Sequence, residues 1–278
     1  MKTINYQKDN LHPDKRRKLL EETAKASTKY LDSLETRRVS PSQSELDELE
    51  KLNSSLQEDS IDPESVVKLL SEVGSKTAMA SAGGRFFGFV IGGSHPVSLA
   101  ANWLAGSWDQ NGGLGVTSPL NAKIEEITSD WLKEILPVSK DSVAGFVTGV
   151  TVANFCGLAA ARHSLLKKQG WDVEAKGLFS APPLKVVIGE HAHGSLLKAL
   201  SLVGFGKDRV IKVPVDKQGR MLADKLPEDI DEKTIVCIQA GSVNSGCFDP
   251  ANKIVPIAKR KGAWVHVDGA FGLWAGAS

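Results

Sequence analysis

The sequence predicts an α/β fold with a mainly parallel, doubly wound sheet that follows a helical N-terminal segment. In the C-terminal half, short runs of β-branched and apolar residues alternate with helical patterns. This alternation is typical of parallel strands whose faces are both covered by helices. The first part of the chain instead has charged stretches with apolar residues at helical spacing, which indicates helices.

The helical part is expected to provide packing or dimer contacts. Asp62 and Pro63 are typical of a helix N-cap and first helical residue, and Gly74 predicts the end of that helix. Residues 85–93 are expected to form a strand or an extended arm. Further helices are predicted at residues 14–39 and 45–56, from residue 96, and from Pro119 to Leu136. We place this helical segment and arm at residues 1–94, and the sheet-containing domain at residues 95–278.

The strands of that domain are expected at four short apolar runs. Each run is bounded by turn residues and followed or preceded by a helical pattern. The predicted strands are residues 184–188, 209–213, 234–239 and 263–267, and the predicted helices are residues 151–170, 195–202 and 250–261.

Composition limits the classes of function. Hydrophobic residues make up 41% of the 278 residues and charged residues 24%, which is usual for a globular protein. A formal net charge of +1 indicates neither a nucleic-acid nor a membrane partner. The three cysteines form no paired motif, and neither a signal peptide nor an apolar run of the ~20 residues that span a bilayer is evident. We therefore expect a cytoplasmic protein.

A glycine and hydroxyl-bearing segment, Thr148 to Thr151, precedes a strongly helical stretch. A helix N-terminus exposes unpaired amide donors and suits a phosphate group. Thr151 is a candidate helix cap, a candidate phosphate ligand, or both. The segment lacks the lysine of a nucleotide-binding P-loop, and no GxGxxG motif precedes a helix, so nucleotide binding is poorly supported.

Two histidines, His191 and His193, follow the strand that ends near Gly189. One interpretation is a metal site completed by His266 and Asp268. Another is a histidine that only packs in a loop. We favour a third, in which an imidazole lies against a flat aromatic cofactor, positions it and moves protons.

Asp268 is expected at the carboxyl end of a strand, where open α/β sheets bind their ligands. A carboxylate there can keep a pyridine nitrogen protonated, because the opposite charge stabilises the pyridinium. Ala270 is small enough to face a planar ring. The segment from Gly241 to Gly246 follows another strand and supplies hydroxyl and amide groups at the same edge, although its glycines are also typical of a plain turn.

Taken together, these segments resemble the pyridoxal-phosphate-dependent group II amino-acid decarboxylases, which have the aspartate aminotransferase fold. The resemblance rests on Thr148–Asn154, Glu190–Ser195, Gly241–Asp249 and His266–Ala270, all in the family's order and spacing. It implies a pyridoxal 5'-phosphate site with His193 and Asp268 as catalytic residues. The cofactor-binding residues that it implies are Gly149, Val150 and Thr151 at the phosphate, His193 on the ring, Ser242 near the cofactor, Asp268 at the pyridine nitrogen and Ala270 at the ring face; no metal is expected.

The chain departs from the family's pattern at Val150 and Val152, which stand where the family has a glycine and an acid. A β-branched residue at position 150 restricts the loop to negative φ. The resemblance also places the cofactor lysine a few tens of residues after Asp268, whereas the last lysine here is Lys261. We therefore expect the N-terminal part of the enzyme, with residues 95–278 forming an incomplete cofactor-binding large domain.

The activity that the resemblance implies is decarboxylation of an amino acid by a cytoplasmic homodimer. Two alternatives stay open at this point. The chain is alternatively a non-catalytic cofactor-binding or interaction fragment, or it serves transaminase or aldolase chemistry on the same fold.

Overall fold

The structure is a computed structural model that describes residues 12–270 and 272–277. The chain forms two compact units, Met1–Asp109 and Gln110–Ser278. The boundary between the two units follows Asp109, so the helix that begins at Pro96 belongs to the first unit. The two domains predicted from the sequence are divided by function and meet at residues 94 and 95. Within the described residues, no helix combines the length and apolar character needed to cross a bilayer.

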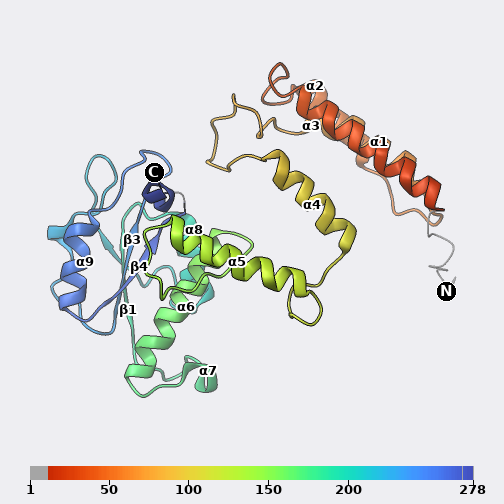
Figure 1. The fold of residues 1–278 in the computed structure, drawn as a ribbon. Helices are drawn as coiled ribbons and strands as arrows, with labels where there is room; N and C mark the ends of the chain where they lie inside the picture. Colours follow the sequence, from red (N-terminus) through yellow and green to blue (C-terminus); the bar gives the residue numbers. More distant parts are fainter. Residues whose placement is uncertain (1–11, 271, 278) are drawn as a thin grey trace. The chain divides into compact units, whose positions relative to one another are not determined.

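The first unit is helical, as the sequence predicts (Figure 1). Its small core includes Val73 and Ala80, both nearly inaccessible to solvent. Its elements are α1 (Pro13–Asp32), α2 (Gln43–Leu46), the 3-10 helix η1 (Asp47–Leu52), α3 (Pro63–Thr77) and α4 (Pro96–Trp108).

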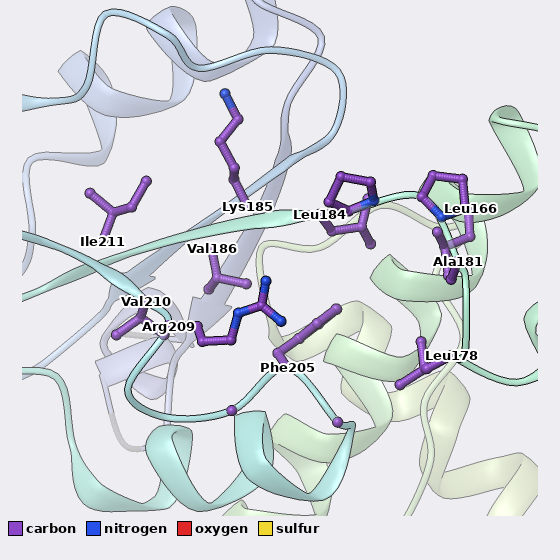
Figure 2. Close-up of a pocket in the computed structure, with 14 residues that line it drawn as sticks. Leu166, Leu178, Ala181, Leu184, Lys185, Val186, Phe205, Arg209, Val210 and Ile211 are labelled. Atoms are coloured by element: carbon purple, nitrogen blue, oxygen red, sulfur yellow. The ribbon is translucent and has the colours of Figure 1, made fainter.

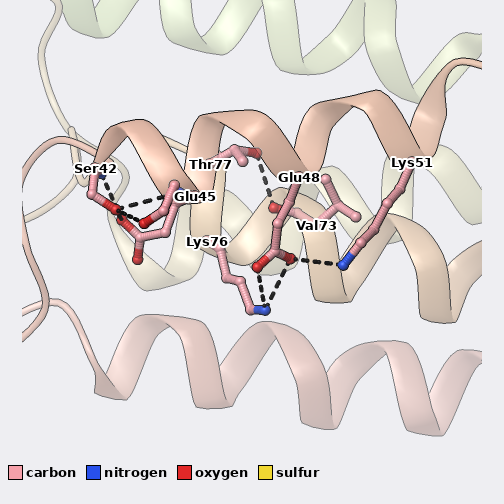
Figure 3. Close-up of polar contacts among 8 residues, drawn as sticks. Ser42, Glu45, Glu48, Lys51, Val73, Lys76 and Thr77 are labelled. Atoms are coloured by element: carbon pink, nitrogen blue, oxygen red, sulfur yellow. Dashed lines mark hydrogen bonds and ion pairs between the residues drawn. The ribbon is translucent and has the colours of Figure 1, made fainter.

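Hydrogen-bonding side chains fix the starts of these helices. Asp62 accepts a hydrogen bond from the amide of Ser65 at 3.0 Å and caps α3 as predicted. Ser42 and Glu45 form a capping box at α2 (Figure 3). Glu48 also accepts hydrogen bonds from Lys76 at 3.0 Å and Lys51 at 3.3 Å, and so links η1 to α3. Exposed pairs of this kind contribute little stability.

Four predicted elements of the first unit differ from the structure in extent or type. The first helix ends at Asp32 because the Ser33 hydroxyl and amide both bond to Tyr30 and close a turn. α3 continues through Gly74 to Thr77, since a helical glycine weakens a helix without ending it. Residues 85–93 contain no strand, because Phe89 and Val90 have φ values of 60° and 50°. The second helix divides into α2 and η1.

The second unit contains a four-stranded parallel sheet in the order β2-β1-β3-β4. The strands are β1 (Lys185–Gly189), β2 (Ile211–Val213), β3 (Thr234–Gln239) and β4 (Trp264–Asp268). The remaining elements are α5 (Pro119–Ile135), α6 (Val150–Lys168), α7 (Val173–Lys176), α8 (Gly194–Leu202), η2 (Ala223–Lys225), α9 (Ala251–Arg260) and η3 (Gly272–Ala277).

Helices cover both faces of this sheet, with α6 and α8 on one side and α9 on the other (Figure 1). Alternate residues of β3 face the two layers: Ile235 packs with Leu158 of α6, whereas Val236 packs with Ile254 of α9. This alternation follows from the twofold side-chain repeat of a strand. The predicted α/β class with a parallel, doubly covered sheet is confirmed.

Candidate cofactor site

Asp268 is the last residue of β4 and lies at the carboxyl edge of the sheet, as predicted. Asp268 is 6% exposed, and its backbone carbonyl oxygen accepts a hydrogen bond from the amide of Ala240 at 2.8 Å. His193 follows β1 and therefore lies at the same edge, because all four strands are parallel. The fold thus brings together the ends of strands that carry the predicted catalytic residues.

The Asp268 carboxylate has amide donors as partners. Asn154 Nδ2 donates to Oδ2 at 3.0 Å, and the Ala270 amide donates to Oδ1 at 3.3 Å. In the described part of the chain, no lysine or arginine forms an ion pair with Asp268. A buried carboxylate without a cationic partner favours binding of a positively charged group. This arrangement fits the protonated ring nitrogen of pyridoxal phosphate.

The first turn of α6 carries the predicted phosphate ligands. The N-cap position of α6 is occupied by Gly149, which has no side chain, and no side-chain hydrogen bond caps the helix. Thr151 is the second residue of the helix and therefore does not cap it. Val150 is the first helical residue, and the negative φ of a helix suits its β-branched side chain. The free amides of this turn and the Thr151 hydroxyl are groups that bind a phosphate dianion. Asn154 lies one helical turn further along the same face as Thr151.

His193 has a structural part in the site. Its Nδ1 accepts a hydrogen bond from the Ser195 amide at 3.2 Å and so caps α8. Its own amide donates to Gln239 Oε1 at 3.1 Å, which ties the loop to the end of β3. Because capping uses Nδ1, the neutral ring carries its proton on Nε2. The residue is exposed.

Ser242 follows β3 and Ala270 follows β4, so both lie in loops at the carboxyl edge of the sheet, where Asp268 ends β4. Ser242 is three residues beyond the end of β3, and its hydroxyl accepts a hydrogen bond from the Asn244 amide at 3.4 Å. No hydrogen bond joins Ser242 to Asp268 or His193 among the described residues. Ala270 is exposed in the turn after β4.

Three buried polar residues were not among the predicted cofactor-site residues, although His266 was considered as a metal ligand: Asn154, Ser195 and His266. Each is at most 8% exposed. Asn154 Oδ1 accepts a hydrogen bond from His266 Nε2 at 2.8 Å, and Asn154 Nδ2 lies 3.5 Å from Ser195 Oγ. A sequence signal existed, because Asn154 follows Thr151 by one turn and His266 precedes Asp268 on the same face of its strand. Burial lowers the pKa of His266, although the nearby Asp268 opposes this effect.

A separate cavity of about 290 Å³ lies at the opposite edge of the sheet (Figure 2). Its walls include Lys185 and Ile211, the first residues of β1 and β2. The Lys185 ammonium pairs with Asp229 at 3.1 Å and Asp231 at 3.4 Å. None of the predicted cofactor-binding residues lines this cavity. Across residues 12–270 and 272–277, no cluster of three or more His, Cys, Asp or Glu side chains has metal-binding geometry.

The fold is that of a parallel α/β protein with polar side chains from consecutive strands at the carboxyl edge of its sheet, an arrangement that suits a phosphate-bearing, positively charged ring. Residues 47–277 match the pyridoxal-dependent decarboxylase conserved domain, and the chain belongs to that family. Pyridoxal phosphate is therefore the cofactor of its family, as predicted.

Solved structures share the fold of this chain. Mouse CSAD in its apo form has a TM-score of 0.83 and 23% identity, over 94% of this chain and 56% of that chain. Oryza sativa TDC with PLP and tryptamine has a TM-score of 0.82 and 23% identity, over 96% and 57%. The glutamate decarboxylase domain of a Vibrio parahaemolyticus protein has a TM-score of 0.82 and 21% identity, over 95% and 59%. The chain thus spans between half and two thirds of the length of these structures.

Proposed function

We propose that this protein is a pyridoxal-phosphate-dependent carboxy-lyase that removes the α-carboxylate of an amino acid. The observation that carries the proposal is the buried Asp268 carboxylate, which lacks a cationic partner among the described residues and lies at the same edge of the sheet as the loop of His193. When bound, pyridoxal phosphate supplies an electron sink that accepts the electron pair of the bond broken as carbon dioxide leaves.

The residues of this chain have distinct parts in that reaction. Gly149, Val150 and Thr151 bind the phosphate through the free donors of the α6 N-terminus. Asp268 binds the ring nitrogen and keeps it protonated, which strengthens the electron sink. His193 lies against the ring and holds a proton at Nε2, while its Nδ1 stays engaged with α8.

Two further residues complete the proposed binding surface. Ala270 lies in the turn whose amide bonds to Asp268, and its small side chain leaves room at the ring face. Ser242 offers a hydroxyl from the loop after β3. We also propose a homodimer in the cytoplasm, since α1 and α3 present exposed leucines such as Leu20 and Leu70 that suit an apolar contact.

The cofactor part of the proposal is tested by equilibrium dialysis of the chain against pyridoxal phosphate. Asp268→Asn keeps the shape of the side chain and removes its charge, so we expect the dissociation constant to rise roughly ten- to hundredfold. Asp224→Asn, an exposed change in the same unit, is the matched control and should have no effect. Equal affinity of the wild type and Asp268→Asn would contradict the proposed pairing.

The reaction itself is tested on the full-length protein with amino acids labelled at the carboxyl carbon. Release of labelled carbon dioxide, dependent on added pyridoxal phosphate, is the expected result. Formation of a keto acid with the label retained would identify a transaminase instead. Cofactor binding with no turnover of any amino acid would identify a non-catalytic protein.

A further inference from the structure

Asn154 lies at the centre of a buried polar network that joins both predicted catalytic residues. Its Nδ2 donates to Asp268 Oδ2 at 3.0 Å, and its Oδ1 accepts from His266 Nε2 at 2.8 Å. Its Nδ2 also lies 3.5 Å from Ser195 Oγ, which is in turn 2.8 Å from His193 Nδ1. Asn154 is 4% exposed, so its own contacts with Asp268, His266 and Ser195 are shielded from water.

Hydrogen-bond chemistry fixes the direction of every bond around Asn154. An ionised carboxylate only accepts, so the group of Asn154 that faces Asp268 has to be its NH₂. Its carbonyl oxygen then faces His266, which has to donate from Nε2. The neutral form of His266 suffices for this, and burial favours that form by lowering its pKa.

Helix α6 has a glycine where the imidazole of His266 packs against it. Gly157 lies one turn after Asn154 on the same face of α6. A Cβ atom at position 157 would lie 2.9 Å from His266 Cε1, closer than carbon atoms pack. Glycine at this position therefore allows His266 to approach α6 and reach Asn154.

We propose that Asn154 and His266 are positioning residues that hold the Asp268 carboxylate in the orientation required by the ring nitrogen of the coenzyme. This inference rests on the proposed function. Asn154 restrains one carboxylate oxygen, and the remaining lone pairs stay available for the ring N–H. His266 helps to prevent the Asn154 amide from turning, because the reversed amide would place its NH₂ against the donating Nε2–H of His266. Such support by neighbouring hydrogen bonds is how binding geometry is held in proteins.

The test separates positioning of Asp268 from general support of the fold. It compares binding of pyridoxal phosphate with binding of its 1-deaza analogue, in which CH replaces the ring nitrogen. Asn154→Leu keeps the branched shape of the side chain and removes both hydrogen bonds. Asn252→Leu makes the same chemical change at an exposed position of α9 and is the matched control. Circular dichroism of each variant verifies that it is folded.

We expect Asn154→Leu to weaken pyridoxal phosphate binding roughly tenfold or more and to change binding of the analogue by no more than about twofold. His266→Gln retains a neutral donor and should bind nearly as the wild type does, whereas His266→Leu should behave like Asn154→Leu. Asn252→Leu should change neither ligand.

An equal loss of affinity for both ligands, or no loss for either, would overturn the positioning role. Should Asn154→Leu fail to fold, the His266→Gln and His266→Leu pair provides the same comparison. If the wild type binds the coenzyme no better than the analogue and Asp268→Asn changes nothing, the proposed function itself fails before Asn154 is considered.

Discussion

At the scale of the residue, His266 is a buried imidazole whose protonation is linked to folding. Its ordinary pKa is 6.5, and burial lowers the pKa in the folded state. Between the lowered pKa and 6.5 the unfolded chain binds more protons, so the free energy of unfolding decreases as the pH falls through this range. Acidification therefore destabilises the second unit through this residue.

We predict that His266→Gln reduces this pH dependence. Urea unfolding between about pH 7 and pH 5 should show a smaller loss of stability in the variant, because glutamine has no proton to bind in this range. His95→Gln, which changes an exposed histidine, is the control and should leave the slope unchanged. Identical slopes in the wild type and His266→Gln would show that His266 is not the linked group.

The polar network around Asn154 shows what the sequence could and could not predict at this scale. Asp268 and Thr151 were predicted because each lies at the end of a recognisable element, where ligands bind. The partners of Asp268 were not, since Asn154 is separated from it by 114 positions and no local pattern records that contact. The capping role of His193 was likewise not predicted, because the same local sequence is compatible with a loop histidine that caps a helix, packs in the loop or binds a ligand.

At the scale of the element, the strands were predicted well and the helix ends less well. β3 occupies residues 234–239 as predicted, since its apolar run is buried on both faces. Helix ends depend on single hydrogen bonds, such as those of Ser33 at the end of α1, and these are weak signals in a sequence. Residues 85–93 were expected to form a strand or an extended arm, and no strand forms there because Phe89 and Val90 have positive φ values.

Helix α8 provides a direct test of the core. Leu200 is fully buried against the sheet, whereas Leu202, two residues later, is 64% exposed. We predict that Leu200→Ala lowers the free energy of unfolding by about 2–5 kcal/mol, because it removes buried methyl groups and leaves a cavity. Leu202→Ala should change it by less than about 0.5 kcal/mol. Chemical denaturation followed by circular dichroism measures both, and similar values for the two variants would contradict the packing described for α8.

At the scale of the whole molecule, the candidate site belongs entirely to the second unit. Asn154, His193, His266 and Asp268 all lie within Gln110–Ser278. The sequence predicted this placement because the motifs follow consecutive strands of one parallel sheet, whose carboxyl ends share an edge. The extent of each compact unit depends on contacts between distant residues, which local patterns do not record.

This placement predicts where the coenzyme should stabilise the protein. A ligand that binds only the folded state stabilises it by about 2.7 kcal/mol at a free concentration one hundred times its dissociation constant. We expect added pyridoxal phosphate to slow amide hydrogen exchange in the first turn of α6 and in β4, and to leave α1 and α3 unchanged. Mass spectrometry of peptides from the exchanged protein measures this, with Asp268→Asn as the control that should show little protection at the same concentration. Protection of α1 and α3 without protection of β4 would place the coenzyme in the first unit and would exclude the site described at Asp268.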